Sequence, residues 1–248
     1  MKFKDKNILV IGGDSDIAKS LIDDLIKLES NIFFTSRNYK KVKSLQQRTI
    51  NDFGIASKGY VLDITNFNSH ELFWDNLEVT PDIVITCIGY MGKVDISGSD
   101  NTDLVNIVNI NYLGLICLLN IISNDFKARK SGGVIVGISS VAGERGRKSN
   151  FIYGSAKSGF TAYLSGLRNK LYMKNVHIIT ILPGPVKTKM TKDLKISKYL
   201  SSSPQVVSSY IIDGIKHRKN VVYVKWYWKF LMLIIKVIPE SIFKKLNL

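Results

Sequence analysis

The stretch NILVIGGDSDIAKSL, residues 7–21, points to the fold class of this 248-residue chain. An apolar, strand-like run ends in a pair of glycines, and a helical pattern follows from Ile17 to about Leu28. A glycine turn between a strand and a helix lets the backbone approach a pyrophosphate, whose charge the helix N-terminus stabilises. The stretch therefore predicts the first strand, turn and helix of a nucleotide-binding α/β fold, with an ordinary tight turn as the alternative.

Strand-like runs and helical stretches alternate along the rest of the chain. The further runs are NIFFTS (31–36), KGYVLDIT (58–65), PDIVITCIG (81–89), GVIVGISS (133–140), VHIITILPG (176–184) and NVVYV (220–224). Together with the first, they predict seven strands that are rich in β-branched residues, as is typical of strands buried on both faces of a parallel sheet. We therefore expect one Rossmann-type, doubly wound α/β domain: a seven-stranded parallel sheet flanked by helices.

The chain carries a net charge of +15. Such an excess favours an anionic partner, which could be nucleic acid, acidic lipid or a phosphorylated substrate, although a lysine-rich composition gives the same excess with no partner. No recognition helix and no platform of alternating aromatic and basic residues is evident, so we expect no nucleic-acid partner. Cys87 and Cys117 lie in apolar runs without C-x-x-C spacing, which indicates neither a metal site nor a disulfide.

The N-terminal sequence MKFKDKNILVIGG leads directly into a strand and lacks the features of a signal peptide. No stretch reaches the about 20 apolar residues of a membrane-spanning helix. We expect a cytoplasmic protein, with peripheral attachment to the inner face of the cell membrane as an option.

The end of the second predicted strand informs the choice of nucleotide. A site for NAD usually has an acidic residue here that binds the ribose hydroxyls, whereas an arginine accommodates the 2′-phosphate of NADP. The sequence FFTSRNYKK places Arg37 at this point, with Lys40 and Lys41 nearby. NADP(H) is therefore the predicted cofactor and NAD(H) remains possible. Asp63, followed by Ile64, ends the third strand and is placed to accept a hydrogen bond from an adenine amino group.

The stretch from Gly133 to Phe160 carries the candidate chemistry. Tyr153 and Lys157 are four positions apart and therefore share one face of a predicted helix. An ammonium near a phenol favours the phenolate, so we expect a lowered pKa for Tyr153. A phenol tuned in this way can donate a proton to a carbonyl oxygen while hydride reaches its carbon. A strand that ends in the pair Ser139 and Ser140 precedes this helix.

The ordered motifs GGDSDIA, VLD, CIG, NINYLG, ISS, YGSAK and PGPVKT resemble the short-chain dehydrogenase/reductase family over residues 7 to about 224. The resemblance implies that Ser140 bonds the substrate carbonyl, that Asn111 holds the water of a proton relay to Lys157, and that Gly89 borders the nicotinamide ribose. It also implies a nicotinamide face and a diphosphate site; with the glycine turn, the predicted cofactor-binding residues are Gly12, Gly13, Asp14, Ser15, Asp16, Ile17, Arg37, Asp63, Ile64, Gly89, Pro183, Gly184, Val186 and Thr188.

Two positions depart from the family pattern. Asp16 replaces a glycine beside the pyrophosphate, and TCIG replaces the more usual NNAG. If Asp16 faces outward, catalysis survives and the placement of the cofactor is what changes. The stretch 139–160 and the C-terminal sequence also resemble a branch of the family, the reductases of decaprenylphosphoryl-2-keto-erythropentose. This implies a ketone on a polyprenyl-phosphate-linked keto-sugar, reduced to a secondary alcohol in cell-envelope polysaccharide synthesis.

The C-terminal sequence KWYWKFLMLIIKVIP, residues 225–239, predicts an amphipathic helical appendage to a catalytic domain of residues 1–224. Trp226 to Ile238 is too short to span a bilayer. At 100° per residue, Lys225, Lys229 and Lys236 share a stripe about 40° wide. Segment 225–248 suits a membrane surface, with lysines toward acidic headgroups. Contact with a partner subunit or a cap on the sheet is the alternative.

Two basic loops are expected beside the site: the loop that follows PGPV, and the one between the serine and the tyrosine. Their cations are Lys187, Lys189, Lys192, Lys195 and Lys198 in the first and Arg145, Arg147 and Lys148 in the second. They predict attraction of a substrate phosphate, with solvated side chains as the alternative.

The long apolar helix predicted from Asp103 to Ala128 suggests pairing with a copy of itself in a homodimer or homotetramer. Besides reduction of a lipid-linked keto-sugar, two functions stay open: reduction of a lipid ketone of keto-sphingoid or acyl type, and a non-catalytic dinucleotide-binding sensor.

Overall fold

The computed structural model describes residues 1–92, 101–192, 197 and 199–246, and the description that follows is confined to them. They contain a single parallel sheet with the strand order β3-β2-β1-β4-β5-β6-β7. The strands are β1 (Asn7–Ile11), β2 (Asn31–Ser36), β3 (Lys58–Val61), β4 (Ile83–Thr86), β5 (Gly133–Ile138), β6 (Val176–Pro183) and β7 (Val221–Val224). All adjacent strands pair in parallel. The predicted seven-stranded, doubly wound sheet is confirmed.

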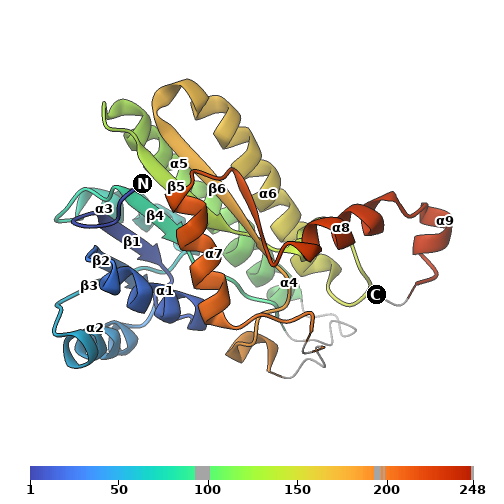
Figure 1. Ribbon diagram of the computed structural model, residues 1–248, viewed down its shortest axis with the longest axis horizontal. Coiled ribbons are helices and arrows are strands. Elements are labelled where there is room, and N and C mark those ends of the chain that lie inside the picture. Colours follow the sequence, from blue (N-terminus) through green and yellow to red (C-terminus); the bar gives the residue numbers. More distant parts are fainter. Residues whose placement is uncertain (93–100, 193–196, 198, 247–248) are drawn as a thin grey trace.

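Helices cover both faces of this sheet (Figure 1). One apolar core lies beneath α1 (Asp16–Lys27), α2 (Tyr39–Phe53) and α7 (Pro204–Lys216). The other lies beneath α3 (His70–Asp75), α5 (Gly114–Ala128) and α6 (Phe151–Leu171). Strand β1 explains why the strands read as continuous apolar runs. Ile8 and Val10 enter the first core and Leu9 and Ile11 the second, because successive side chains point to opposite faces.

The strand order reverses between β1 and β4, since the chain builds β2 and β3 on one side of β1 and then returns to build β4 on the other. Loops diverge at the carboxyl ends of strands beside such a reversal, and they leave a crevice in which ligands of this fold class bind. The turn after β1 and the segments after β4, β5 and β6 all meet at that edge.

Residues 101–128 form one long helical stretch: α4 (Asn101–Val108), a π-helical segment (Asn109–Leu113) and α5. An 18-residue window of this stretch has a mean hydropathy of 1.8, so by length and composition it would suffice to cross a bilayer, a feature the sequence prediction missed. However, Leu115, Leu118, Ile122 and Phe126 are fully buried in the core beneath α3 and α6. These contacts identify the stretch as a core helix of the domain.

The C-terminal segment forms α8 (Tyr227–Val237) and α9 (Glu240–Phe243), which extend from the sheet beside its carboxyl-terminal edge (Figure 1). Trp228 and Met232 are buried in a small cluster with Val141 and Leu182. The alternative of a cap on the domain is therefore correct for one side of α8.

The lysine stripe expected on this helix is wrong in two respects. Lys225 lies before the helix, in a left-handed conformation with φ of 68°, and its ammonium donates to the Ser201 carbonyl. Lys236 turns toward the domain, where it pairs with Glu144 at 3.1 Å. Only Lys229 of the three is an exposed lysine on the helix without such a tie among the described residues.

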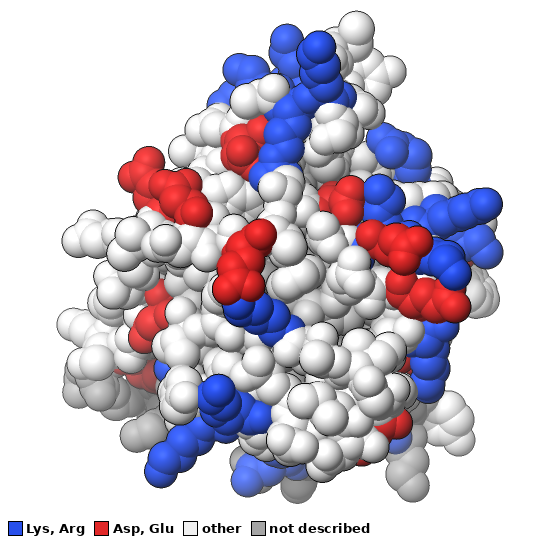
Figure 2. All heavy atoms as spheres, turned by 90° about the vertical axis from the view of Figure 1, so that its left-hand side faces the viewer, with Lys and Arg blue, Asp and Glu red and all other residues white. Residues whose placement is uncertain are grey.

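The surface charge is mixed on the face that Figure 2 shows, which is the left-hand side of Figure 1. Lysines and arginines are interspersed there with aspartates and glutamates, and uncharged surface lies between them. This face therefore offers no continuous basic surface of the kind that tracks a nucleic-acid backbone.

Candidate functional site

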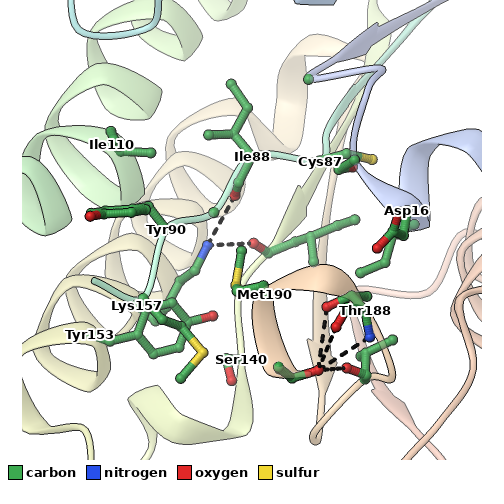
Figure 3. A pocket seen from close by; sticks show the side chains of 18 of the residues that line it. Asp16, Cys87, Ile88, Tyr90, Ile110, Ser140, Tyr153, Lys157, Thr188 and Met190 are labelled. Atoms are coloured by element: carbon green, nitrogen blue, oxygen red, sulfur yellow. Dashed lines mark hydrogen bonds between the residues drawn. The ribbon is translucent and has the colours of Figure 1, made fainter. Parts of the chain in front are cut away.

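A pocket of about 770 Å³ occupies the predicted edge of the sheet, at the carboxyl ends of β1, β4, β5 and β6 (Figure 3). It is lined by sixteen of the residues predicted from the sequence: Gly12, Asp14, Ser15, Asp16, Ile17, Arg37, Asp63, Ile64, Gly89, Ser140, Tyr153, Lys157, Pro183, Gly184, Val186 and Thr188. Two predicted residues, Gly13 and Asn111, lie beside the pocket and do not line it. Gly13 sits against Phe34, which leaves no room for a side chain.

The turn after β1 has the backbone that a phosphate cradle needs. Gly12 adopts φ of +84°, and a Cβ there would lie 2.7 Å from the Ile88 side chain and 3.2 Å from the Cys87 carbonyl oxygen. Only glycine fits such a position. Ser15 caps α1 by accepting a hydrogen bond from the Ala18 amide at 3.2 Å. The turn thus directs the N-terminus of α1 toward the pocket, an arrangement that favours anions.

Two carboxylates of this turn have specific partners. Asp14 pairs with Lys41 at 2.7 Å, and although burial opposes its ionisation, this ammonium helps to hold the pKa of Asp14 below its usual value. Asp16 accepts a hydrogen bond from the Lys189 amide at 2.8 Å and lines the pocket. Asp16 therefore does not face outward, which was the condition under which catalysis was expected to survive its replacement of glycine. Its carboxylate ties the glycine turn to the loop after β6.

Tyr153 and Lys157 both face the pocket from the first turns of α6 (Figure 3). The Lys157 ammonium donates to the carbonyl oxygens of Ile138 at 3.1 Å and Ile88 at 3.4 Å, and lies 5.8 Å from the centre of the Tyr153 ring. Burial raises the pKa of Tyr153 to about 12, against a hydrogen bond with Ser140 that lowers it. The expected lowering of this pKa by Lys157 is wrong: burial raises the pKa of Tyr153, and the Lys157 ammonium bonds two carbonyls instead of the phenol.

Burial also lowers the pKa of Lys157 to about 7. The side chain is only 2% exposed, and the charged form loses its hydration there. Lys157 therefore changes its charge near neutral pH, within reach of the pocket.

Ser140 and Ser139 point in different directions, as adjacent strand residues do. Ser139 is buried and donates to the Lys157 carbonyl at 3.0 Å, so that it supports α6. Ser140 lines the pocket, and its hydroxyl accepts a hydrogen bond from the Ala142 amide at 3.1 Å. Both serines line the pocket, but the Ser139 hydroxyl is engaged with α6, so Ser140 is the one placed to meet a ligand.

Asn111 is fully buried in the π-helical segment, next to the pocket wall. Its amide donates to the carbonyls of Tyr90 at 2.5 Å and Ile107 at 2.8 Å, and its carbonyl accepts from the Tyr90 amide at 3.1 Å. A Cβ at Gly89 would lie 3.5 Å from Asn111 Oδ1 and 4.0 Å from Lys157 Nζ. The side chain of Asn111 thus fixes the segment after β4 close to the lysine.

The predicted adenosine and nicotinamide positions also lie in this pocket. Arg37 is exposed at the rim of the pocket. Asp63 accepts hydrogen bonds from the amide and the hydroxyl of Thr65. The bond from the Thr65 amide is the largest of the effects that lower the pKa of Asp63. Gly184 packs closely on α8, since a Cβ there would lie 2.2 Å from the Trp228 ring. Thr188 caps a short 3-10 turn, Lys189–Thr191, in a reciprocal arrangement with Thr191.

The model of the family described as short chain dehydrogenase matches residues 6–198. The chain belongs to the short-chain dehydrogenase family. An uncharacterised oxidoreductase of Mycobacterium tuberculosis is 27% identical over 162 residues, which cover 65% of this chain and 64% of that protein. An uncharacterised oxidoreductase of Streptomyces coelicolor is 24% identical over 97% of this chain and 96% of its own length.

Solved structures of short-chain dehydrogenases share the fold. One from Burkholderia cenocepacia, in complex with NADP, superposes with a TM-score of 0.84 at 17% identity and covers 100% of both chains. Another from Sphingobium yanoikuyae, in complex with NADPH, has a TM-score of 0.79 at 18% identity and covers 95% of this chain and 97% of its own.

Several pocket residues of this short-chain dehydrogenase were not predicted, among them Met190, Tyr90 and Asn150. The Met190 side chain lies 3.3 Å from the position of a Cβ at Gly89 and extends over the pocket (Figure 3). Tyr90 lines the pocket wall, and its hydroxyl donates a hydrogen bond to the Asp103 carboxylate at 2.5 Å. Asn150 lines the pocket with a buried Oδ1 that has no hydrogen-bond partner in the described part of the chain. Asn150 directly precedes α6 in a non-helical conformation, so its spacing of three from Tyr153 is not a helical-face signal.

Proposed function

We propose that this protein is an NADPH-dependent reductase that converts a ketone into a secondary alcohol. One observation supports this above all: Ser140, Tyr153 and Lys157 reach the same pocket as the glycine turn and the N-terminus of α1. A cofactor bound along the turn and a carbonyl bound at Ser140 would thus share one cavity. We propose the division of the chain accordingly, with residues 1–224 as the catalytic domain and 225–248 as a docking segment.

The residues of the pocket fit a dinucleotide. Gly12 leaves open the space that a Cβ would fill, and α1 presents its N-terminus there. We propose that Gly12, Gly13, Asp14, Ser15, Asp16, Ile17 and Thr188 surround the diphosphate, with Asp63 and Ile64 at the adenine. Gly89, Pro183, Gly184 and Val186 would adjoin the nicotinamide side. Arg37 would bind a 2′-phosphate, which favours NADP(H) over NAD(H), and the neighbours in complex with NADP or NADPH support this choice.

The cofactor, when bound, supplies hydride to the carbonyl carbon. Tyr153 is protonated at neutral pH because burial raises its pKa to about 12, so it can donate a proton to the carbonyl oxygen. Ser140 donates a hydrogen bond to the same oxygen and orients it. Lys157, with a pKa of about 7, returns a proton toward Tyr153, and Asn111 holds the relay in place through its bonds to the backbone.

We propose that the substrate carbonyl belongs to a keto-sugar linked to a polyprenyl phosphate, of the kind used in cell-envelope polysaccharide synthesis. The support is the apolar side of α8 that does not pack on the domain. Its residues Trp226, Phe230, Leu233, Ile234 and Val237 are between 55% and 71% exposed. The opposite side of α8 touches Gly184 at the pocket wall. A lipid ketone is the second candidate, since the same face suits any apolar chain.

The same face supports a peripheral position at the inner surface of the cell membrane. Large aromatic and aliphatic side chains on one side of a helix, with exposed Lys229 and the exposed Lys244 and Lys245 beyond it, suit the boundary between headgroups and acyl chains. A cytoplasmic protein held there would meet a lipid-linked sugar at the bilayer surface.

The substitution Tyr153→Phe tests the reaction. It removes the proton donor and leaves the ring, so NADPH oxidation with a reactive ketone such as 9,10-phenanthrenequinone should fall by at least about 100-fold, the usual contribution of general acid catalysis. NADPH binding, followed by nicotinamide fluorescence, should remain and should be tighter than NADH binding in both proteins. Turnover that survives in the variant would refute the proposed chemistry. Loss of binding would mean that the variant is damaged, which its melting temperature would reveal.

A further inference from the structure

The loop between Ser140 and Tyr153 holds three cations that the sequence prediction treated as one group, and the structure separates them. Arg145 is fully engaged with the C-terminal segment: its guanidinium donates to three carbonyls and one carboxylate and stacks on one ring. These partners are Ile235, Lys236, Ile238, Glu240 and Phe243. Arg145 therefore fastens α8 and α9 to the domain and is not available to a ligand.

Arg147 is in the opposite situation. Its Nε is buried and has no hydrogen-bond partner within the described part of the chain. Burial lowers its pKa from the ordinary value, but an arginine remains charged at neutral pH. A buried donor without a partner is unfavourable, and an anion that accepted its hydrogen bond would offset that cost.

Arg147 also stands between two cavities. It lines the catalytic pocket together with Tyr153, and it lines a second hollow of about 360 Å³ between its own loop and the segment around α9. This hollow adds the ammonium groups of Lys148 and Lys244. Glu240, the one carboxylate among its described lining residues, is already paired with Arg145 at 2.8 Å. Phe151 and Leu246 contribute apolar surface, so the hollow combines positively charged side chains with apolar ones.

We propose that Arg147, with Lys148 and Lys244, binds a phosphate group carried by the ketone substrate. Because Arg147 reaches both cavities, a phosphate in the hollow can belong to a molecule whose carbonyl lies at Tyr153 in the pocket. The phosphates of the cofactor have other proposed partners, at the glycine turn, Thr188 and Arg37. The inference rests on the proposed function, and it names the recognition element by which the reductase selects phosphorylated ketones.

Binding of octyl phosphate to the protein saturated with NADP⁺ tests this assignment, because the nucleotide then fills its own anion sites. Titration calorimetry and the fluorescence of the tryptophans in the C-terminal segment report the complex. Arg147→Met should weaken the affinity about tenfold or more, as expected when a hydrogen bond to a charged group is lost. Lys148→Met and Lys244→Met should weaken it less, and Arg147→Lys should restore part of it. Lys170→Met, at an exposed lysine of α6, is the matched control and should bind like the wild type.

Three results would overturn the inference. The first is equal affinity of the wild type and Arg147→Met for octyl phosphate. The second is equal affinity of the wild type for octyl phosphate and uncharged octanol. The third is a loss of binding to phosphatidylglycerol vesicles in Arg147→Met while its affinity for octyl phosphate is unchanged, which would assign Arg147 to lipid headgroups. None of these measurements needs turnover, so their failure is distinct from a failure of the proposed reaction, which Tyr153→Phe tests.

Discussion

At the scale of single residues, Lys157 is the most unusual group of the site. Its ammonium is buried with two carbonyl oxygens as acceptors, and no carboxylate pairs with it in the described part of the chain. The folded pKa of about 7 lies well below the 10.5 of a free lysine. The protein thus buries a lysine side chain, which lowers its stability, at the position where the proposed reaction needs a proton carrier.

Lys157 should make stability depend on pH. Between pH 7 and 10.5 the Lys157 side chain binds its proton more strongly in the unfolded chain than in the folded protein, so the free energy of unfolding rises with pH in this window. Below pH 7 the side chain is protonated in both states, and the destabilisation from burying its charge is fully present. From pH 7 to 8.5 the gain is roughly 1–2 kcal/mol, and for a domain of this size it corresponds to a few degrees of melting temperature.

Lys157→Met should remove that gain. Thermal unfolding without cofactor, measured at pH 7 and 8.5, should show a smaller rise in melting temperature for the variant than for the wild type. Lys170→Met, which changes an exposed lysine of the same helix, should retain the full rise. Identical pH dependence in all three proteins would show that Lys157 is not the buried titrating group.

At the scale of elements, α8 has two apolar sides with different roles. The side with Trp228 and Met232 packs on Val141 and Leu182 and thereby supports the wall of the pocket at Gly184. The side with Phe230, Leu233 and Ile234 is exposed. Because Arg145 fastens the carbonyls at the end of the helix, this exposed side is presented in a fixed orientation beside the pocket.

The exposed side of α8 is expected to bind lipid. Leu233→Glu places a charge at its centre, and should weaken binding to vesicles that contain phosphatidylglycerol by about tenfold or more, since burial of a leucine side chain is lost and a charge must be desolvated. Co-sedimentation with vesicles measures this. Leu72→Glu is the matched control because Leu72, on α3, is 67% exposed against 57% for Leu233. Equal losses in both variants would contradict a specific role for α8.

At the scale of the whole molecule, the parallel sheet brings the functional groups together. The glycine turn follows β1, Ser140 follows β5 and Thr188 follows β6. With β4 between β1 and β5, these strands form a continuous part of the sheet that begins at the point where the order reverses. Helix α4 leaves part of its apolar surface uncovered, with Leu104 and Val105 38% and 49% exposed. We propose that this surface pairs with a second copy in a homodimer or homotetramer.

Val105→Glu should therefore shift the protein toward monomer, which sedimentation velocity measures. The reason is that a charge would have to be buried against the same charge of the partner. Val61→Glu is the matched control: Val61 is 52% exposed, on edge strand β3. A wild type that sediments as a monomer at every concentration would refute the pairing.

The sequence alone determined the sheet and the glycine turn, and it predicted most of the side chains that were expected at the site and that meet in the pocket. These features are visible because periodicity and residue type are local: seven apolar runs predict seven buried strands, and the four-residue spacing puts Tyr153 and Lys157 on one helical face. The sequence also indicated a helical C-terminal segment after β7, although the bounds of α8 differ by a residue or so from the expected ones.

Only the tertiary structure decided what each charged group meets. Asp16 turns to the loop after β6, Lys236 turns to Glu144, and Arg145 and Arg147, two positions apart, end in opposite situations. The pKa of Tyr153 likewise follows from burial instead of from its neighbour in the helix. Electrostatic pairing and desolvation depend on atoms that are distant in the chain and close in space, so no local pattern contains them.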